Sequence, residues 1–183
     1  MFYCVCGIIM RWTLVALIFL IVVIPLLSSF STAEDYVVIN SYDGQDVLSG
    51  IFYANVRNLS VHFMVPFQSN LNFISKLERH KDIFLIQSAT FPISGFLESD
   101  LKANNNSVSL FSLSNATRTN FALAELSKAD SIILIDSAYS DSALSVLAYA
   151  KYTHSYVIFA DKHNAKQIRE LVISKKINLT LYG

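Results

Sequence analysis

Cysteine is almost absent from this chain. Of its 183 residues only Cys4 and Cys6 are cysteines, and both precede a long apolar run. The remainder therefore has no disulfide framework and no thiolate metal site. Glycine is scarce too, with five in all, and neither G-x-G-x-x-G nor G-x-x-x-x-G-K-S/T occurs. With no G-x-S-x-G elbow either, the sequence predicts no cofactor and no metal.

Charge is low and balanced. Lysine and arginine together number 14, aspartate and glutamate also 14, and charged residues make up 15% of the chain. Binding to a phosphate backbone requires an excess of Lys and Arg on one face, so we expect no nucleic-acid partner. No run of like charges indicates a solvated tail or a basic membrane patch.

The long apolar run is TLVALIFLIVVIPLL, residues 13–27, with Arg11 before it and SSFSTAED after it. A positive residue, an apolar core and a small-x-small ending describe a secretory signal peptide cleaved after Ala33. If the MFYCVCGII prefix is counted, the run is long enough for an uncleaved signal anchor, and Met10 is the more orthodox start. Both alternatives place the remainder outside the cell.

We therefore expect residues 1–33 to be a signal peptide or signal anchor, and residues 34–183 to be an exported domain. Its expected location is the extracellular face of the cell envelope, secreted or membrane-anchored. Four N-x-S/T sequons in the exported part are candidate glycosylation sites, and they begin at Asn58, Asn105, Asn115 and Asn178.

After residue 35 short apolar runs alternate with amphipathic stretches. The runs lie at 36–40, 60–65, 82–87, 107–112, 130–135, 155–160 and 177–182. The stretches of helical period lie at 46–57, 68–79, 96–103, 117–128, 142–152 and 163–175. Apolar runs between helices are typical of buried parallel strands. The pattern predicts an α/β fold, a mainly parallel sheet with helices on both faces.

One segment occurs twice. VVINSYDGQDVLSGIFYANVRNLSVHFMV (37–65) aligns without a gap with ILIDSAYSDSALSVLAYAKYTHSYVIFAD (133–161), shifted by 96 positions. The matches include Leu48 with Leu144, Tyr53 with Tyr149, and Phe63 with Phe159. The sequence therefore predicts two similar strand-helix-strand-helix-strand halves, about 35–103 and 104–183.

The loops after the first and fifth strands hold the candidate ligand-binding carboxylates, because ligands bind at the carboxyl ends of strands in open α/β sheets. These residues are Asp43, Asp46, Asp136 and Asp141. Asp46 and Ser142 are equivalent in the repeat and have the side chains of N-caps, as do Asn115 and Thr117 further along. Loop carboxylates can hold a divalent cation, but cap and turn roles explain these residues as well.

The second half resembles the type 2 cell wall-binding repeat of prokaryotic surface proteins. That family shows an Arg-x-x-x-Ala helix, an apolar strand, an Asp-Ala-Leu-Ala-Ala helix, an inner strand and a last strand ending in Gly-Gly. Here Arg118 with Ala122 matches the first element, and SALSVLAYA (142–150) matches the helix, with Ser142 where the family prefers Asp. YVIFAD matches the inner strand, and LTLYG the last.

The first half is similar, since DVLSGIFYA keeps Asp46 and SVHFMVP keeps the strand, although no Arg helix precedes them. The likeness spans nearly all of residues 36–183 and suggests a diverged two-repeat variant, an archaeal one among the alternatives. It implies a non-catalytic module that binds a cell-envelope polysaccharide or an S-layer. It also implies contact with the membrane through residues 1–33 if these are uncleaved, and a homo-oligomer or tandem-repeat partner. The expected ligand-binding residues are Asp43, Asp46, Arg118, Asp136, Asp141 and Ser142.

Two other classes of function stay open. One is an extracytoplasmic small-molecule binding domain that holds its ligand between the two halves. The other is an enzyme, a hydrolase or transferase, that uses the four loop aspartates. No second convergent catalytic motif favours the enzyme.

Overall fold

The computed structural model describes residues 34–182, except for the side chains of residues 139–141. The chain from Glu34 onward is one compact unit with its own apolar core, as expected of an independently folding domain. The predicted signal segment and its cleavage position lie outside the described residues. Within the described part, no helix has the length and apolarity to span a membrane.

The predicted alternation of strands and helices is confirmed in the described residues. The strands are β1 (Tyr36–Asn40), β2 (Ser60–Phe63), β3 (Asp82–Ser88), β4 (Ser107–Leu113), β5 (Ser131–Asp136), β6 (Tyr156–Ala160) and β7 (Asn178–Tyr182). The helices are α2 (Gly44–Arg57), α3 (Asn70–Ile74), α4 (Leu97–Ala103), α5 (Ala116–Ser127), the 3-10 helix η1 (Ser137–Ser142), α6 (Ala143–Tyr152) and α7 (Ala165–Lys175).

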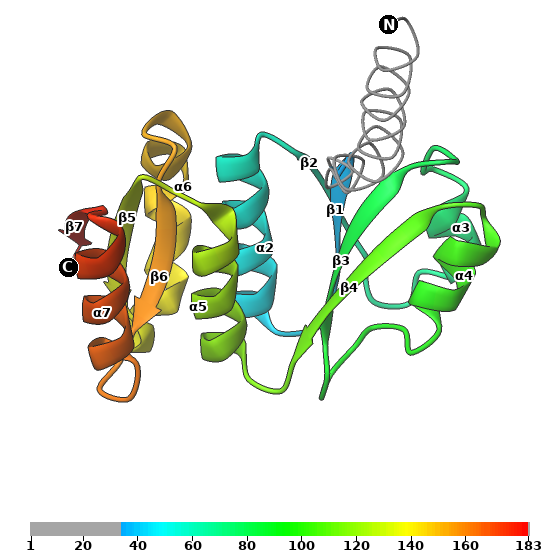
Figure 1. Ribbon diagram of the computed structural model, residues 1–183. Coiled ribbons are helices and arrows are strands. Elements are labelled where there is room, and N and C mark those ends of the chain that lie inside the picture. Colours follow the sequence, from blue (N-terminus) through cyan, green and yellow to red (C-terminus); the bar gives the residue numbers. More distant parts are fainter. Residues whose placement is uncertain (1–33, 183) are drawn as a thin grey trace, which may run out of the picture. The chain divides into compact units, whose positions relative to one another are not determined.

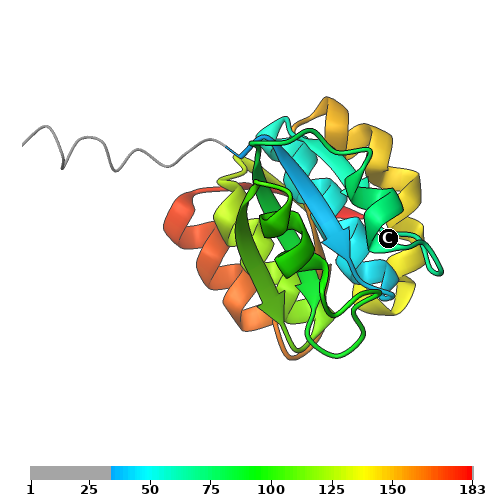
Figure 2. The same ribbon diagram turned by 90° about the vertical axis from the view of Figure 1, so that its right-hand side faces the viewer.

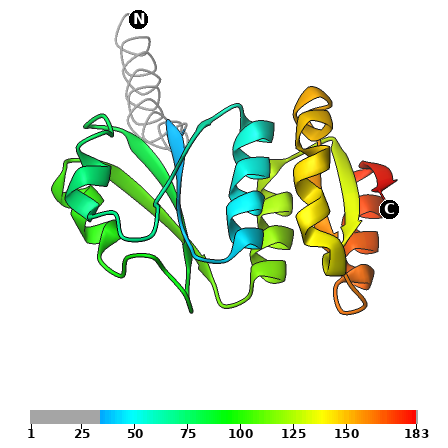
Figure 3. The same cartoon turned by 180° about the vertical axis from the view of Figure 1, so that it is seen from behind.

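The strands divide between two parallel sheets. Sheet A has the order β2-β1-β3-β4, and sheet B has the order β6-β5-β7. Helices α2 and α5 lie between the two sheets, and α6 and α7 lie on opposite faces of sheet B (Figures 1 and 3). The α/β fold class with helices on both faces is therefore confirmed, with the strands shared between two sheets.

The sequence repeat is also a structural repeat. In sheet A, Tyr36 pairs with Ser60 and Ile83; in sheet B, Ile132 pairs with Tyr156 and Leu179. Each partner is displaced by the same 96 positions. The first repeat unit is thus β1-α2-β2-α3-β3 and the second is β5-η1-α6-β6-α7-β7. The block α4-β4-α5 between them has no counterpart in the described residues.

Sheet A is apolar on both faces because its central strands are continuous apolar runs, and successive side chains of a strand point to opposite faces of the sheet. Val38 and Leu85 face α3 and α4, where they pack with Leu97 and Leu101; Figure 2 looks onto the molecule from this side. Val37, Ile39 and Phe84 belong instead to the larger cluster, which continues through α2 and α5 into sheet B. The two sheets therefore share one core.

Helix α2 approaches sheet A closely at Gly50. A Cβ atom at this position would lie 2.5 Å from Cδ1 of Ile39 and 3.1 Å from Cδ1 of Ile86. Real Cβ atoms essentially never come within 3.0 Å of another side chain, so any larger residue at position 50 requires Ile39 or the helix to shift. The equivalent residue of α6 is Val146, which shows that the second repeat unit does not need the same approach.

Asn120 of α5 joins the helices between the two sheets to the edge of β6 that faces away from β5. Its Nδ2 donates to the carbonyl of Val157 at 3.0 Å, and its Oδ1 accepts from the N–H of Phe159 at 3.0 Å. Nδ2 also donates to Ser49 Oγ on α2 at 3.0 Å. The side chain is fully buried. A single amide thus satisfies strand-edge groups that water cannot reach.

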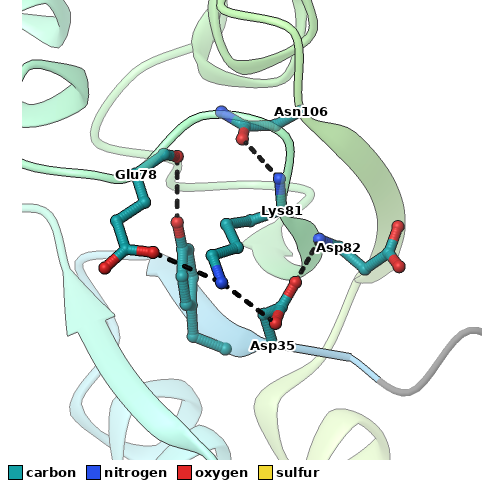
Figure 4. A network of polar contacts seen from close by, with 6 residues as sticks. Asp35, Glu78, Lys81, Asp82 and Asn106 are labelled. Atoms are coloured by element: carbon teal, nitrogen blue, oxygen red, sulfur yellow. Dashed lines mark hydrogen bonds and ion pairs between the residues drawn. The ribbon is translucent and has the colours of Figure 1, made fainter.

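The amino ends of β1 and β3 are joined by a polar network (Figure 4). Oδ2 of Asp35 accepts from the backbone N–H of Asp82 at 2.9 Å, and Oδ1 lies 3.4 Å from Lys81 Nζ. Lys81 also pairs with Glu78 at 3.3 Å, and its N–H donates to Oδ1 of Asn106 at 3.1 Å. This network lies at the end of sheet A opposite to the one where α2 and α5 begin.

Candidate binding site at the carboxyl ends of sheet A

The N-termini of α2, α5 and α7 lie at one end of the molecule, the lower end in Figure 1. A cavity of about 530 Å³ opens at this end beside the carboxyl ends of β1, β3 and β4. It is lined by Asp43, Gly44, Gln45, Asp46, Leu48, Ser88, Thr90, Phe91, Ser114, Asn115, Ala116 and Thr117. We call it the main cavity. Its position agrees with the rule that ligands bind at strand carboxyl ends.

Asp43, not Asp46, is the N-cap of α2. Its backbone is extended, and its side chain accepts a hydrogen bond from the N–H of Gln45 at 2.8 Å. The prediction that Asp46 caps this helix is wrong, because the helix begins at Gly44 and Asp46 falls inside the first turn. The capping role therefore goes to the residue whose backbone is still extended.

Asp46 is instead a buried carboxylate at the wall of the main cavity, with only 3% of its surface exposed. Its Oδ2 accepts from the Ser41 hydroxyl at 2.7 Å, whereas Oδ1 is buried with no hydrogen-bond partner. The neighbouring Thr119 hydroxyl donates to the carbonyl of Asn115 at 3.1 Å. An unpaired buried carboxylate oxygen is energetically costly, so this atom is the strongest sign of a ligand.

Burial raises the pKa of Asp46 above its ordinary value of 3.8, and the nearby charge of Asp43 acts in the same direction. The hydrogen bond from the Ser41 hydroxyl opposes this rise, and the nearby Thr119 hydroxyl adds a smaller effect in the same direction. The net effect is that the pKa of Asp46 is raised. The folded protein therefore binds a proton at this carboxyl more readily than the unfolded chain does.

Helix α5 begins at the other side of the main cavity. Asn115 is its N-cap, and its Oδ1 accepts from the N–H of Arg118 at 3.1 Å. Of the two caps that the sequence suggested here, the structure thus selects Asn115, and Thr117 lines the cavity instead. The first N–H groups of a helix lack intrahelical partners, so two helix starts present hydrogen-bond donors to this cavity.

Asn40, which sequence reasoning missed, holds in place the loop after β3 that lines the main cavity. It is fully buried at the end of β1; its Nδ2 donates to the carbonyl of Ser94 at 2.6 Å, and its Oδ1 accepts from the N–H of Ser94 at 2.9 Å. The N–H of Tyr42 donates to the carbonyl of Phe91 at 3.1 Å. These bonds fix the loop that carries Thr90 and Phe91. The signal in the sequence that could have identified Asn40 is a polar residue at the end of an apolar strand.

A second cavity, of about 350 Å³, lies on the other side of the α5 N-terminus. It shares Asn115 and Thr117 with the main cavity. Its remaining lining residues are Arg118, Asp161, His163, Asn164 and Gln167. Arg118, which was predicted to bind ligand, is therefore close to the main cavity. Oδ1 of Asp161 accepts hydrogen bonds from the N–H groups of His163 and Asn164, at 2.7 and 2.9 Å.

The candidate residues of the second repeat unit lie elsewhere. Asp136 lines a separate cavity of about 430 Å³, and its Oδ1 accepts from the N–H of Ala138 at 2.8 Å. Ser142 occupies the N-cap position of α6 without making a side-chain cap bond, so its predicted capping bond is wrong. Asp141 belongs to η1, and its side chain is outside the described part.

The second repeat unit does not keep the buried amide that holds a loop of the main cavity or the buried carboxylate that lines it. Its equivalents of Asn40 and Asp46 are Asp136 and Ser142. The first substitution removes the amide that bonds to Ser94, and the second removes the buried carboxylate. The structure thus brings together Asp43, Asp46 and Arg118 but not Asp136 or Ser142.

All four sequon asparagines are exposed. Asn115 differs from the other three because it lines both cavities and caps α5. A glycan attached there would compete with any ligand in the main cavity. In the described residues, no three His, Cys, Asp or Glu side chains lie close enough to form a metal site.

No family model matches this chain, and no curated protein is similar enough to count as a match. The likeness to the cell wall-binding repeat therefore stays a prediction from the sequence.

Proposed function

We propose that this protein is a non-catalytic cell-envelope module that binds a cell-wall or surface glycan in the main cavity. The observation that carries the proposal is the buried carboxylate of Asp46, a residue that lines the cavity and whose Oδ1 has no hydrogen-bond partner. A hydroxyl group of a sugar supplies the missing donor. Such a bond to a charged acceptor contributes about 1.5–3 kcal/mol.

The other lining groups support a polyhydroxylated ligand. Ser88, Thr90 and Thr117 bring hydroxyls, and Gln45 and Asn115 bring amides, so both donors and acceptors line the cavity. Phe91 adds an exposed aromatic ring at the rim, which can pack against the C–H face of a sugar. The cavity is open rather than enclosed by apolar side chains, as suits a polymer that continues beyond it.

The environment expected for the domain also supports a glycan. An apolar leader, four exposed sequons and the likeness to cell wall-binding repeats all favour the extracellular face of the envelope. Asp43 is engaged in capping, and Asp46 is buried against Ser41, so neither carboxylate is placed as a solvent-exposed acid or base. This geometry favours binding over catalysis.

A small-molecule binding domain is the second candidate. The volume of about 530 Å³ falls in the range typical of small-ligand pockets, about 300–1,000 Å³. A small-molecule binding domain would bind a monosaccharide as tightly as a longer fragment of the same glycan, whereas a glycan-binding module would bind the longer fragment more tightly. Comparing a monosaccharide with longer fragments of the same glycan distinguishes the two candidates.

The test is a calorimetric titration of the unit from Glu34 onward with soluble oligosaccharides released from the cell envelope. Asp46→Asn keeps the shape and the Ser41 contact but removes the charged acceptor, and we expect affinity to fall about tenfold or more. Asp136→Asn makes the same chemical change in a separate cavity and should leave affinity unchanged. Equal affinities for wild type and Asp46→Asn would contradict the proposed site.

A further inference from the structure

The outer edge of β7 is open. Within the described residues β7 pairs only with β5, and all five of its residues are exposed. The equivalent strand of the first repeat unit, β3, pairs on both edges, with β1 and with β4. The same position in the fold is thus filled by a strand in one sheet and unfilled in the other.

The apolar side chains around this edge are exposed as a consequence. Leu181 is 76% exposed, whereas its equivalent Leu85 is 0% exposed beneath α3 and α4. Tyr149 is 52% exposed, whereas its equivalent Tyr53 is 3% exposed and stacks on Phe84 at 4.9 Å. Exposed apolar groups on both faces of one strand indicate a surface that is covered in the working protein.

The edge carries none of the features that keep sheet edges apart. Natural edge strands are protected by charged residues, proline or bulges, and β7 is NLTLY, with neither charge nor proline. Its sequence is also self-complementary. If two copies of β7 pair antiparallel about Thr180, Leu179 of each lies opposite Leu181 of the other. Leucine pairs of this kind stabilise a sheet.

We infer that a second copy of this chain covers the edge, and that the protein forms a dimer through antiparallel β7–β7 pairing. The two three-stranded sheets then become one six-stranded sheet, which extends the established ladder β6-β5-β7. The contact is isologous and closes on itself, as in most homodimers. This inference is independent of the proposed glycan site, which lies in the first repeat unit.

The exposed apolar side chains on both faces of sheet B near β7 are consistent with this arrangement. A two-fold axis perpendicular to the sheet keeps α6 on the same face as its copy, and α7 likewise. Leu144 and Tyr149 are exposed on α6, and the Ser145 hydroxyl lies 3.0 Å from the Tyr182 hydroxyl, which places this flank of α6 beside β7. These apolar groups therefore meet their copies across the axis on one face, while Leu179 and Leu181 do so on the other.

Sedimentation velocity of the unit from Glu34 onward, over a wide concentration range, tests the dimer. We expect wild type to dimerise and Leu181→Lys to be monomeric, because the two-fold axis places like charges close together. The matched control is Leu110→Lys on β4, one of the two edge strands of sheet A, where Leu110 is also exposed. This control should remain dimeric. Circular dichroism confirms that each variant is folded.

A cysteine trap tests the register in a protein whose fold is undisturbed. The unit from Glu34 onward has no cysteine, so Thr180→Cys places a single thiol opposite its copy, at a spacing suited to a disulfide. We expect Thr180→Cys to form a covalent dimer under mild oxidation and Ser109→Cys on β4 to stay monomeric. A monomeric wild type, a dimer retained by Leu181→Lys, or equal crosslinking at both positions would overturn the inference.

Discussion

Asp46 has opposing effects on the stability of the fold and on ligand binding. Its buried carboxylate has one unpaired oxygen, which costs folding free energy, and the same oxygen is the group that a ligand hydroxyl would satisfy. Binding residues that are poorly satisfied in the free protein are a common form of the trade-off between stability and function. The residue therefore allows a test that needs no ligand.

We predict that Asp46→Asn raises the free energy of unfolding at neutral pH. Burial raises the pKa of Asp46 above 3.8, so the charged form is disfavoured in the folded state. As pH falls through the folded-state pKa, wild type takes up its proton and regains this stability, so the gap between the two proteins narrows. Urea unfolding across the acidic range measures it. A variant less stable than wild type at neutral pH would contradict the account.

Asn120 is a fully buried polar residue that links α5 to α2 and β6. Asn120→Ala leaves the carbonyl of Val157 and the N–H of Phe159 without partners in a buried position. We predict a loss of about 2–4 kcal/mol in the free energy of unfolding. Asn72→Ala, at an exposed position of α3, is the control and should change stability by less than about 0.5 kcal/mol. Similar losses for both would show that the Asn120 amide is not required.

At the scale of elements, apolar runs and helical period were sufficient to predict every strand and α-helix of the described residues, whereas the 3-10 helix η1 was not predicted. The first and last residues of these elements were harder to predict. Helix α3 was expected over 68–79 but extends only over Asn70–Ile74. The choice of Asp43 over Asp46 as the cap depends on where the backbone leaves the extended conformation, and both residues have suitable side chains. Sequence alone does not distinguish them.

The spacing between α2 and sheet A yields a prediction of its own. Gly50→Ala should gain about 1 kcal/mol of helix propensity but lose about 1–3 kcal/mol to overpacking against Ile39 and Ile86. We expect a net loss of stability in thermal unfolding. Gly95→Ala, where an added Cβ meets nothing within 4 Å, is the control and should be neutral. A stabilised Gly50→Ala would show that the helix can move away at no cost.

At the scale of the whole molecule, the repeat predicted two similar halves but not that their strands would form two separate sheets. The edge of β6 is bonded by Asn120, a lone asparagine in an amphipathic helix whose partners are 36 or more positions away in the chain. The candidate site was foreseen in part. Asp43 and Asp46 line the main cavity and Arg118 lines the cavity beside it, whereas Asp136 belongs to sheet B and lines a separate cavity.

The amino end of sheet A gives a prediction of opposite sign to that for Asp46. The hydrogen bond from the backbone N–H of Asp82 is the largest effect and lowers the pKa of Asp35 below 3.8; burial opposes it, and the charge of Lys81 adds to the lowering. Its stabilising contribution is therefore present above pH 3.8 and is lost as pH falls through the lowered pKa. Asp35→Asn should be less stable than wild type at neutral pH, and the difference should disappear in acid. A difference independent of pH would contradict this.

The central claim is that the main cavity attaches the domain to an envelope glycan. Its most direct test is cosedimentation of the unit from Glu34 onward with purified cell envelope, before and after its carbohydrate polymers are stripped, with Asp46→Asn in parallel. We predict that wild type pellets with native envelope only, and that Asp46→Asn stays largely in solution. No pelleting of wild type with native envelope, or equal pelleting after stripping, would contradict the account.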